Sequence, residues 1–458
     1  MDIGLIGLGT MGRNLVLNME EHGYSVAVYN RTTKKMLEFI RENPDKQMKG
    51  YETIEQFIQS LKEPRIIFVL VEAGCPVDQV LEELRPYLSI NDTVVDAGNS
   101  NYLDTERRSE KYKNMFSFVG CGVSGGEEGA RHGPSIMPGG DSNSWPALKS
   151  ILYKIAAKTA SNEPCCEWIG PGGAGHFVKM VHNGIEYGEM AILSEIFLIL
   201  RKFMNLKEIS DIFEEWNKNE ETKSYLIEIA SRILRKKENG DPVIEKIEDR
   251  AAQKGTGKWC LEAALECNVP VNLMVEAVFS RMLSAEKEKR EFISREINPI
   301  SIPYHSELII DELKHAYILS RAVSYIQGFN LMKSMSRKKI WNLNLNDIAR
   351  IWKNGCIIRS EFLNVIQKII SEDVDEYEFT STYRSILQSN LSALRKVVLY
   401  SVERGIPVPV LGSCICYLDG LLTANGPGGF IQCLRDYFGA HKVRFMGENE
   451  DRHYNWDS

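Results

Sequence analysis

The chain has 458 residues, too many for a single hydrophobic core, so two or three domains are expected. Its 43% hydrophobic and 26% charged residues are typical of a soluble globular protein, and its net charge of −7 argues against nucleic acid as a partner. The ten cysteines include no C-x-x-C pair, which argues against a metal site, and no apolar run is long enough to span a membrane. Because a strand begins at Asp2, we expect no signal peptide and predict a cytoplasmic protein.

The first residues have the pattern of a strand, a glycine-rich turn and a helix. A β-type run at 2–6 precedes the turn Gly7-Leu8-Gly9-Thr10-Met11-Gly12, and an amphipathic segment follows at 13–23. The first glycine of this G-x-G-x-x-G pattern permits a tight turn, the second admits a pyrophosphate, and the third allows close helix packing. The pattern predicts a Rossmann-like dinucleotide-binding domain in which residues 7–12 contact the cofactor.

The second predicted strand, 25–29, ends in Asn30-Arg31-Thr32. NAD-binding domains usually carry an acidic residue here for the ribose 2′-hydroxyl, whereas an arginine suits a 2′-phosphate. Arg31 can pair with that phosphate or stack on adenine, and Asn30 and Thr32 can add hydrogen bonds. These residues therefore predict NADP as the cofactor, although a plain turn and N-cap before a helix at 33–42 would look the same.

Further α/β alternation predicts strands at 65–71, 93–97 and 116–120, with a helix at 77–87. The strand at 93–97 is followed by small and polar residues that include Asn99, where open α/β sheets place ligand contacts. We expect loops at 120–126 and 133–140. Ser124, Gly125 and Gly126 offer a hydroxyl and backbone N–H groups to an anion, with a glycine-rich linker as the alternative.

A polar stripe interrupts an otherwise hydrophobic helical pattern near the middle of the chain. Lys179, His182, Asn183, Glu186 and Tyr187 are spaced i, i+3, i+4, i+7 and i+8, which places them within an arc of roughly 140° on one helix face. Charged groups that face a protein interior are costly unless they are used. The stripe predicts an active-site wall that carries a base and an acid. The alternative is a solvated helix face.

The rest of the chain has a helical pattern, with long amphipathic runs at 180–204, 313–335 and 393–404. Between these runs, the segment QKGTGKW at 253–259 places two lysines and a threonine among glycines. It lacks the eight-residue P-loop pattern, and a flexible turn would look similar. We interpret it as a phosphate cradle.

Five motifs make the chain similar to the decarboxylating 6-phosphogluconate dehydrogenases of the pentose phosphate pathway. They are GVSGGEEGAR (122–131), AGHFVKMVHNGIEYG (174–188), QKGTGKW (253–259), GCIIRS (355–360) and RDYFGAH (435–441). The resemblance covers nearly the whole chain. It implies an NADP-binding Rossmann-like domain at 1–175, a large all-helical substrate and dimerisation domain at 176–430, and a C-terminal tail at 431–458 that reaches the partner subunit of a homodimer.

The resemblance also implies roles for individual residues. Lys179 is expected as general base and Glu186 as general acid. The cofactor is expected to contact Val71, Glu72, Ala73 and Asn99 in addition to residues 7–12 and 30–32. Residues around the sugar acid 6-phosphogluconate are expected to be Asn99, Ser124, Gly125, Gly126, His182 and Asn183. Residues at its phosphate are expected to be Tyr187, Lys254, Thr256 and Arg281, joined by Arg435 and His441 from the partner subunit.

The chemistry of the reaction agrees with these two catalytic roles. Oxidation of a secondary alcohol needs a base for the hydroxyl proton and an acceptor for the hydride. A lysine can be that base only when it is neutral, which requires a lowered pKa. The β-keto acid product loses carbon dioxide once its ketone is protonated, and the resulting enediol needs an acid. No metal is needed.

Two departures from the family pattern and two rival functions remain open. Glu72 stands where the family usually has lysine, so it could weaken cofactor binding or point away, and residues 421–430 diverge. One rival is a non-decarboxylating β-hydroxyacid dehydrogenase, which would not need Glu186 or the phosphate set. The other is a catalytically retired nucleotide-binding homologue, which would be signalled by loss of Lys179 or Glu186, and both residues are present.

Overall fold

A mixed sheet organises the N-terminal part of the computed structural model, which describes residues 1–253, 255–297, 307, 309–372 and 374–457. Its strands are β1 (Ile3–Ile6), β2 (Val26–Tyr29), β3 (Met48–Tyr51), β4 (Ile66–Val69), β5 (Thr93–Asp96), β6 (Ser117–Ser124) and β7 (Ser135–Gly140). They lie in the order β3-β2-β1-β4-β5-β6-β7. All neighbours pair in parallel except β6 and β7. This arrangement confirms the predicted Rossmann-like domain.

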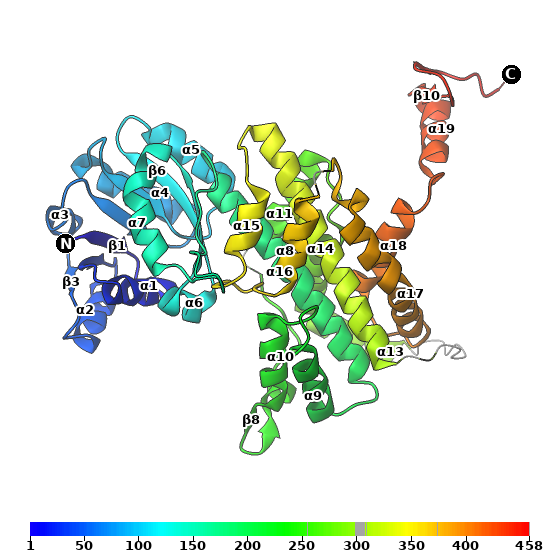
Figure 1. Cartoon of the computed structure of the whole chain (residues 1–458), viewed down its shortest axis with the longest axis horizontal. Helices are drawn as coiled ribbons and strands as arrows, with labels where there is room; N and C mark the ends of the chain where they lie inside the picture. The colour runs from blue at the N-terminus through cyan, green and yellow to red at the C-terminus, as the bar shows by residue number, and fades with distance from the viewer. Residues whose placement is uncertain (254, 298–306, 308, 373, 458) are drawn as a thin grey trace.

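Helices cover both faces of this sheet (Figure 1). They are α1 (Thr10–Glu21), α2 (Thr33–Glu42), α3 (Ile54–Gln59), α4 (Cys75–Leu84), α5 (Tyr102–Tyr112), α6 (Gly126–His132) and α7 (Trp145–Ile155). Apolar residues of α1, α2 and α7 pack on one face and those of α3, α4 and α5 on the other. The inner strands β1, β2 and β4 carry apolar residues on both sides because both sides are covered, as in a doubly wound sheet.

The predicted end of the strand at Gly120 was wrong. The loops expected at 120–126 and 133–140 largely continue as β6 and β7. The reason is close packing against α8 (Ala174–Leu200): a Cβ atom on Gly120 would lie 2.7 Å from Nδ1 of His176, and one on Gly139 would lie 2.6 Å from the backbone nitrogen of Gly175. Glycines in these strands therefore admit a helix to the sheet surface, rather than form a loop.

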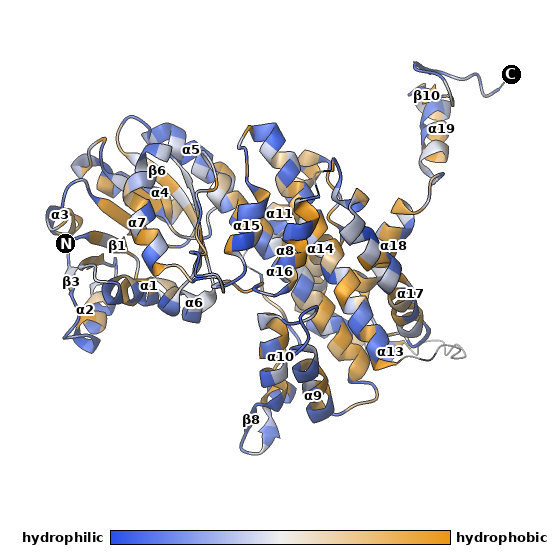
Figure 2. Ribbon diagram, in the orientation of Figure 1, coloured by the Kyte–Doolittle hydropathy of each residue, from blue (hydrophilic) through white to orange (hydrophobic). Residues whose placement is uncertain are grey.

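The second part of the chain is helical and is built around α8 and α14 (Ile310–Lys339), which pack against each other. Around them lie α9 (Leu206–Trp216), α10 (Tyr225–Arg235), α11 (Thr256–Cys267), α12 (Asn272–Ala285), α13 (Lys287–Glu296), α15 (Leu345–Ile351), α16 (Phe362–Ile370), α17 (Ser381–Glu403) and α18 (Pro409–Leu421). Figure 2 shows many hydrophobic residues along α8, whereas α14, α9 and α10 each carry a mixture of hydrophobic and hydrophilic residues. No helix among the described residues is long and apolar enough to cross a membrane.

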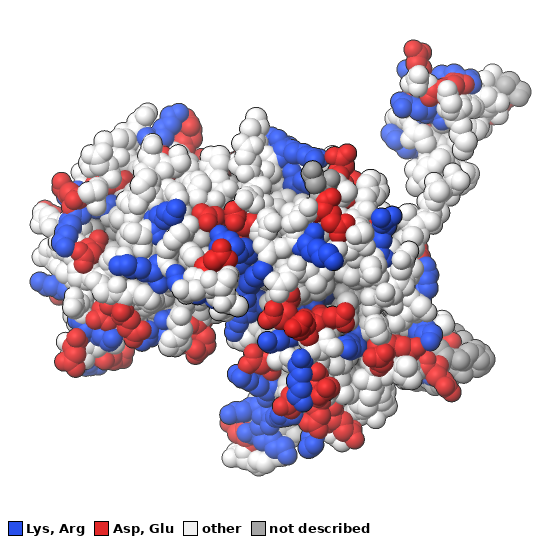
Figure 3. All heavy atoms as spheres, viewed as in Figure 1, with Lys and Arg blue, Asp and Glu red and all other residues white. Residues whose placement is uncertain are grey.

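The tip of the α9–α10 pair carries the short hairpin β8 (Lys237–Glu238) and β9 (Asp241–Pro242). On the face seen in Figure 3, cations and anions are interspersed over this region. Many of them are paired: Arg235 lies 2.8 Å from Asp211 and also contacts Glu214. Such exposed pairs contribute about 0–1 kcal/mol each.

The C-terminal segment stands apart from the rest of the chain (Figure 1). It contains α19 (Gly428–Gly439) and the hairpin β10 (Val443–Arg444) and β11 (Asp451–Arg452). The buried carboxylate of Asp436 holds it together by accepting bonds from the backbone nitrogens of Lys442 and Tyr454, at 2.6 and 3.0 Å, and from the Trp456 indole at 2.9 Å. The tail is therefore a small folded unit joined to α18 by a short connection.

Candidate active site

The polar stripe of α8 forms one continuous hydrogen-bonding face. The Lys179 side-chain nitrogen donates to Oδ1 of Asn183, and the same Nζ lies 3.5 Å from Nδ1 of His182. The other ring nitrogen of His182, Nε2, is 3.3 Å from the Ser124 hydroxyl at the end of β6. Glu186 follows one turn later, with Oε2 3.7 Å from Nδ1 of His182. The predicted base and acid therefore share a face with three predicted substrate contacts.

Burial shifts the pKa values of the titratable groups on this face. Lys179 is 7% exposed, and desolvation lowers its pKa against the opposing charge of Glu186. Desolvation also raises the pKa of Glu186, while Lys179 and Arg281 oppose the shift. The pKa of the fully buried His182 is held well below its usual value by burial and by Lys179. Both shifts are toward the neutral forms, which are the forms that a base and an acid require.

Close packing of α8 on β6 places Lys179 at the sheet. A Cβ atom on Gly122 would lie only 2.4 Å from Cβ of Lys179. The turn after β6 also depends on glycine: Gly125 and Gly126 have φ values of 111° and 62°, and a Cβ on Gly125 would lie 2.5 Å from the Gly355 carbonyl oxygen. This turn follows Ser124, which contacts His182, so backbone without side chains at Gly125 and Gly126 lies beside the polar face of α8.

A second group of predicted residues meets at the far end of the stripe. The Arg281 guanidinium stacks over the Tyr187 ring at 3.6 Å from its centroid. The first turn of α11 packs on the same ring, since a Cβ on Gly257 would lie 2.8 Å from it, and Thr256 is the first residue of that helix. A helix N-terminus and a guanidinium together suit a phosphate group. Lys254, predicted here too, lies outside the described residues.

The glycine-rich loop has an open side and a packed side. A Cβ on Gly7 or Gly12 would collide with backbone atoms at 2.3 and 2.0 Å, whereas at Gly9 it would meet no heavy atom within 4 Å. Gly9 is the N-cap residue of α1, and no side chain accepts a hydrogen bond there. The first N–H groups of the helix therefore remain available to a pyrophosphate. The Leu8 nitrogen donates to Oδ1 of Asn30 at 2.9 Å, and the Asn30 amide donates to the Thr32 carbonyl at 3.0 Å. Asn30 thus shapes the loop itself.

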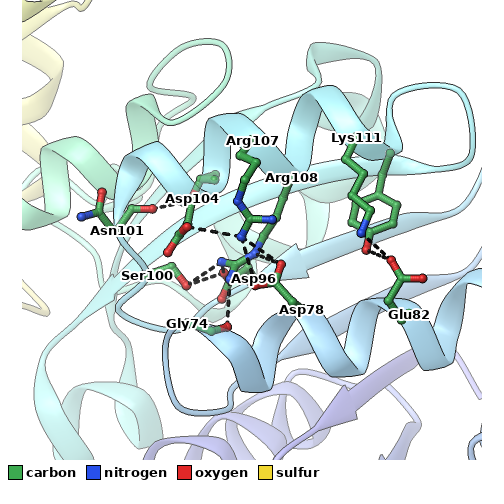
Figure 4. Close-up of polar contacts among 12 residues, drawn as sticks. Gly74, Asp78, Glu82, Asp96, Ser100, Asn101, Asp104, Arg107, Arg108 and Lys111 are labelled. Atoms are coloured by element: carbon green, nitrogen blue, oxygen red, sulfur yellow. Dashed lines mark hydrogen bonds and ion pairs between the residues drawn. The ribbon is translucent and has the colours of Figure 1, made fainter.

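The remaining predicted cofactor residues surround this loop. Arg31 and Glu72 are exposed, as is Asn99 in the turn after β5. That turn is held by Asp96, which accepts a bond from the Gly98 nitrogen at 3.1 Å and one from the Ser100 hydroxyl at 2.6 Å (Figure 4). The sequence analysis noted the polar strand end but missed that Asp96 faces inward to shape the turn.

Arg435 and His441 lie in the tail, away from α8 in this single chain (Figure 1). The Arg435 guanidinium donates to Oε1 of Gln432 at 2.9 Å, and the Gln432 amide donates to the His441 carbonyl at 3.2 Å. Both predicted residues are exposed. One copy of the chain therefore does not bring them to Lys179.

A second buried acid on α8 was missed by the sequence analysis. Glu189 accepts bonds from the hydroxyls of Tyr317 and Tyr325, both at 3.4 Å, and lies 3.8 Å from the Arg321 guanidinium. Burial raises its pKa to about 7, despite the nearby Arg321. Its spacing of i+3 from Glu186 within a hydrophobic run could have indicated it.

Comparisons with known proteins point to a single family. Family models match at residues 2–170 (NAD binding domain of 6-phosphogluconate dehydrogenase) and 175–456 (6-phosphogluconate dehydrogenase, C-terminal domain). Relatives named "6-phosphogluconate dehydrogenase, decarboxylating" include those of Chlamydia muridarum and Drosophila melanogaster. Each is 44% identical, over 98% and 99% of this chain and 95% and 96% of the relative.

A solved structure of Plasmodium falciparum 6-phosphogluconate dehydrogenase superposes with a TM-score of 0.93 at 36% identity, with 100% of each chain covered. The likeness therefore includes both the sheet and the helical part, with no large segment of either protein left over. The chain belongs to the family of decarboxylating 6-phosphogluconate dehydrogenases.

Proposed function

We propose that this chain oxidises and decarboxylates 6-phosphogluconate to ribulose 5-phosphate and carbon dioxide, with reduction of NADP to NADPH. The observation that carries the proposal is the pairing of Lys179 and Glu186 on one face of α8, with burial shifting their pKa values in opposite directions. The Plasmodium falciparum relative is described with its cofactor NADP+ and its substrate 6-phosphogluconate. A β-hydroxyacid dehydrogenase without decarboxylation would not need Glu186.

The residues support a two-stage use of Lys179. Neutral Lys179 takes the proton of the hydroxyl β to the carboxylate as the hydride leaves. NADP, when bound, accepts that hydride. The ammonium so formed then donates to the new ketone oxygen, which withdraws electrons while the bond to the carboxylate breaks and carbon dioxide departs. Protonated Glu186, two turns along the same face, delivers a proton to carbon 1 of the enediol.

The NADP site is proposed at residues 7–12, 30–32 and 71–73. The open face at Gly9 and the uncapped start of α1 fit a pyrophosphate. No carboxylate stands at position 30, and the exposed guanidinium of Arg31 is free to reach a 2′-phosphate. The substrate is proposed to lie between Asn99, Ser124–Gly126 and the α8 stripe, with its phosphate near Tyr187, Lys254, Thr256 and Arg281.

We further infer a cytoplasmic homodimer with shared active sites, built from the parts 1–175, 176–430 and 431–458. Large apolar side chains on α19, such as Phe430 and Phe438, are 71% and 74% exposed, which suits a helix that packs on another chain. Arg435 and His441 on the same tail then complete the phosphate site of the partner. Free thiols at all ten cysteines suit a reducing compartment.

Stoichiometry tests the proposal most directly. Purified protein with NADP and 6-phosphogluconate is expected to release one carbon dioxide for each NADPH, measured by absorbance and by a coupled carboxylase assay. NADPH without carbon dioxide would identify a non-decarboxylating enzyme. No NADPH with any β-hydroxyacid would identify a nucleotide-binding homologue without activity.

A further inference from the structure

A buried arginine of α5 joins two loops of the candidate site. The Arg108 guanidinium is fully buried, and one of its terminal nitrogens donates to the Gly74 carbonyl at 2.9 Å. The other lies 3.4 Å from the Ser100 hydroxyl and 3.5 Å from the Asp96 carboxylate. Gly74 ends the loop after β4, and Ser100 ends the turn after β5. Figure 4 shows the guanidinium between these two segments.

The planar fork of arginine suits this position. Asp78 of α4 accepts two bonds from Arg108. One comes from Nε at 2.9 Å, and the other, at 3.0 Å, comes from the terminal nitrogen that also donates to Gly74. The five N–H donors of a guanidinium are fixed in one plane, so contacts to Asp78, Gly74 and Ser100 constrain one another. A shift of either loop would break a bond to a buried charge, which is costly.

We propose that Arg108 is a positioning residue that holds the cofactor loop 71–74 and the substrate turn 97–100 in one geometry. The inference rests on the proposed function, which gives these segments the contacts Val71, Glu72, Ala73 and Asn99. Hydride transfer needs the donor and acceptor carbons aligned, and a small misplacement costs rate. Arg108 touches neither ligand in this view; it sets the distance between the two loops that do.

The neighbouring arginine provides a matched control. Arg107 also binds Asp78, at 3.0 and 3.1 Å, but its other contact is Asp104 of its own helix at 3.3 Å. Arg107→Met and Arg108→Met therefore each remove one guanidinium that binds Asp78, but only Arg108→Met also removes the contacts to the two loops. Arg108→Lys keeps a cation beside Asp78 but cannot reach both loops, and it decides the question if Arg108→Met does not fold.

The readouts are KM for NADP and for 6-phosphogluconate, kcat, and the primary deuterium isotope effect with substrate deuterated at the oxidised carbon. We expect Arg108→Lys to raise both KM values at least fivefold, to lower kcat at least tenfold and to increase the isotope effect on kcat. Arg107→Met is expected to stay within twofold of the wild type. A purely structural defect would lower kcat with the folded fraction and leave KM and the isotope effect unchanged.

Two results in the Arg108 variants would overturn the inference while the proposed function stands. One is a kcat that falls only with the folded fraction, with KM and the isotope effect unchanged. The other is kinetics within twofold of the wild type. A wild type with no activity on 6-phosphogluconate would instead overturn the proposed function, and this inference with it. Circular dichroism and thermal melts of all three variants supply the folded fraction.

Discussion

Gly122 of β6 and Lys179 of α8 face each other so closely that a Cβ atom on the glycine would lie 2.4 Å from Cβ of the lysine. Real Cβ atoms do not approach this closely, so Gly122→Ala must displace α8 or the strand. Overpacking of this kind costs about 1–3 kcal/mol. We expect a lower melting temperature and a fall in kcat, because the base moves with its helix.

The control for this substitution is Gly412→Ala in α18. A Cβ there would meet no heavy atom within 4 Å, and alanine has the higher helix propensity by about 1 kcal/mol. Thermal melts and steady-state kinetics of the two variants are compared. Unchanged kcat in Gly122→Ala would show that the contact does not set the position of Lys179.

Removal of the base should stop both chemical stages. Lys179→Met is isosteric enough to keep the packing but has no basic nitrogen, so oxidation and decarboxylation of the 3-keto intermediate should both fall by about 10²–10⁴-fold. Glu186→Gln should instead slow the protonation of the enediol. Solvent exchange at carbon 1 of the product separates the two effects. Normal turnover in a folded Lys179→Met protein would contradict the assignment.

The pH dependence of kcat/KM follows from the direction of the two shifts. Activity requires neutral Lys179 and protonated Glu186, so it is lost at low pH when both are protonated and at high pH when both are deprotonated. Because burial lowers the pKa of Lys179 and raises that of Glu186, both limbs should lie between the ordinary glutamate and lysine values. Because Lys179 and Glu186 interact, the two apparent pKa values of the profile describe the pair and neither is assigned to one residue.

Glu186→Gln tests this reading of the profile. The variant has no acid to lose, so its low activity should rise with pH to a plateau without an alkaline fall. The rise should report the titration of Lys179 alone, because the carboxyl that titrates together with it is gone. A retained alkaline limb would assign that limb to another group.

The spacing of the α8 stripe was enough to predict that its polar side chains share one face, because helix periodicity places i, i+3, i+4 and i+7 together regardless of the surroundings. The course of β6 was not predictable in the same way. Its glycines have low strand propensity, and the close approach of α5 and α8 explains them. Arg108 was missed for a related reason: its partners come from three segments that meet only in the folded sheet.

Cofactor choice can be tested at two exposed positions of the nucleotide site. Arg31→Glu removes a cation for the 2′-phosphate and adds a repelling charge, so it should abolish most of the preference for NADP over NAD. Glu72→Lys should strengthen NADP binding, because it replaces an acid beside an anionic ligand. Competition between the two cofactors in steady-state kinetics measures both. A wild type that uses NAD as efficiently as NADP would contradict the assignment of Arg31.

The last prediction concerns the proposal that each active site is built from residues of two subunits. Arg435 lies on α19, which stands apart from α8 and its Tyr187 in the single chain (Figure 1), so we expect it to reach the phosphate site only from a partner. A charge-assisted bond is worth about 1.5–3 kcal/mol, so Arg435→Ala should raise KM for 6-phosphogluconate about 10- to 100-fold with little change for NADP.

Lys179→Met and Arg435→Ala homodimers should each be nearly inactive at low substrate. Heterodimers of the two variants, formed by refolding together and purified with two different affinity tags, should regain one intact site and up to half of the wild-type activity. If purified heterodimers show no recovery, the two residues do not act across an interface.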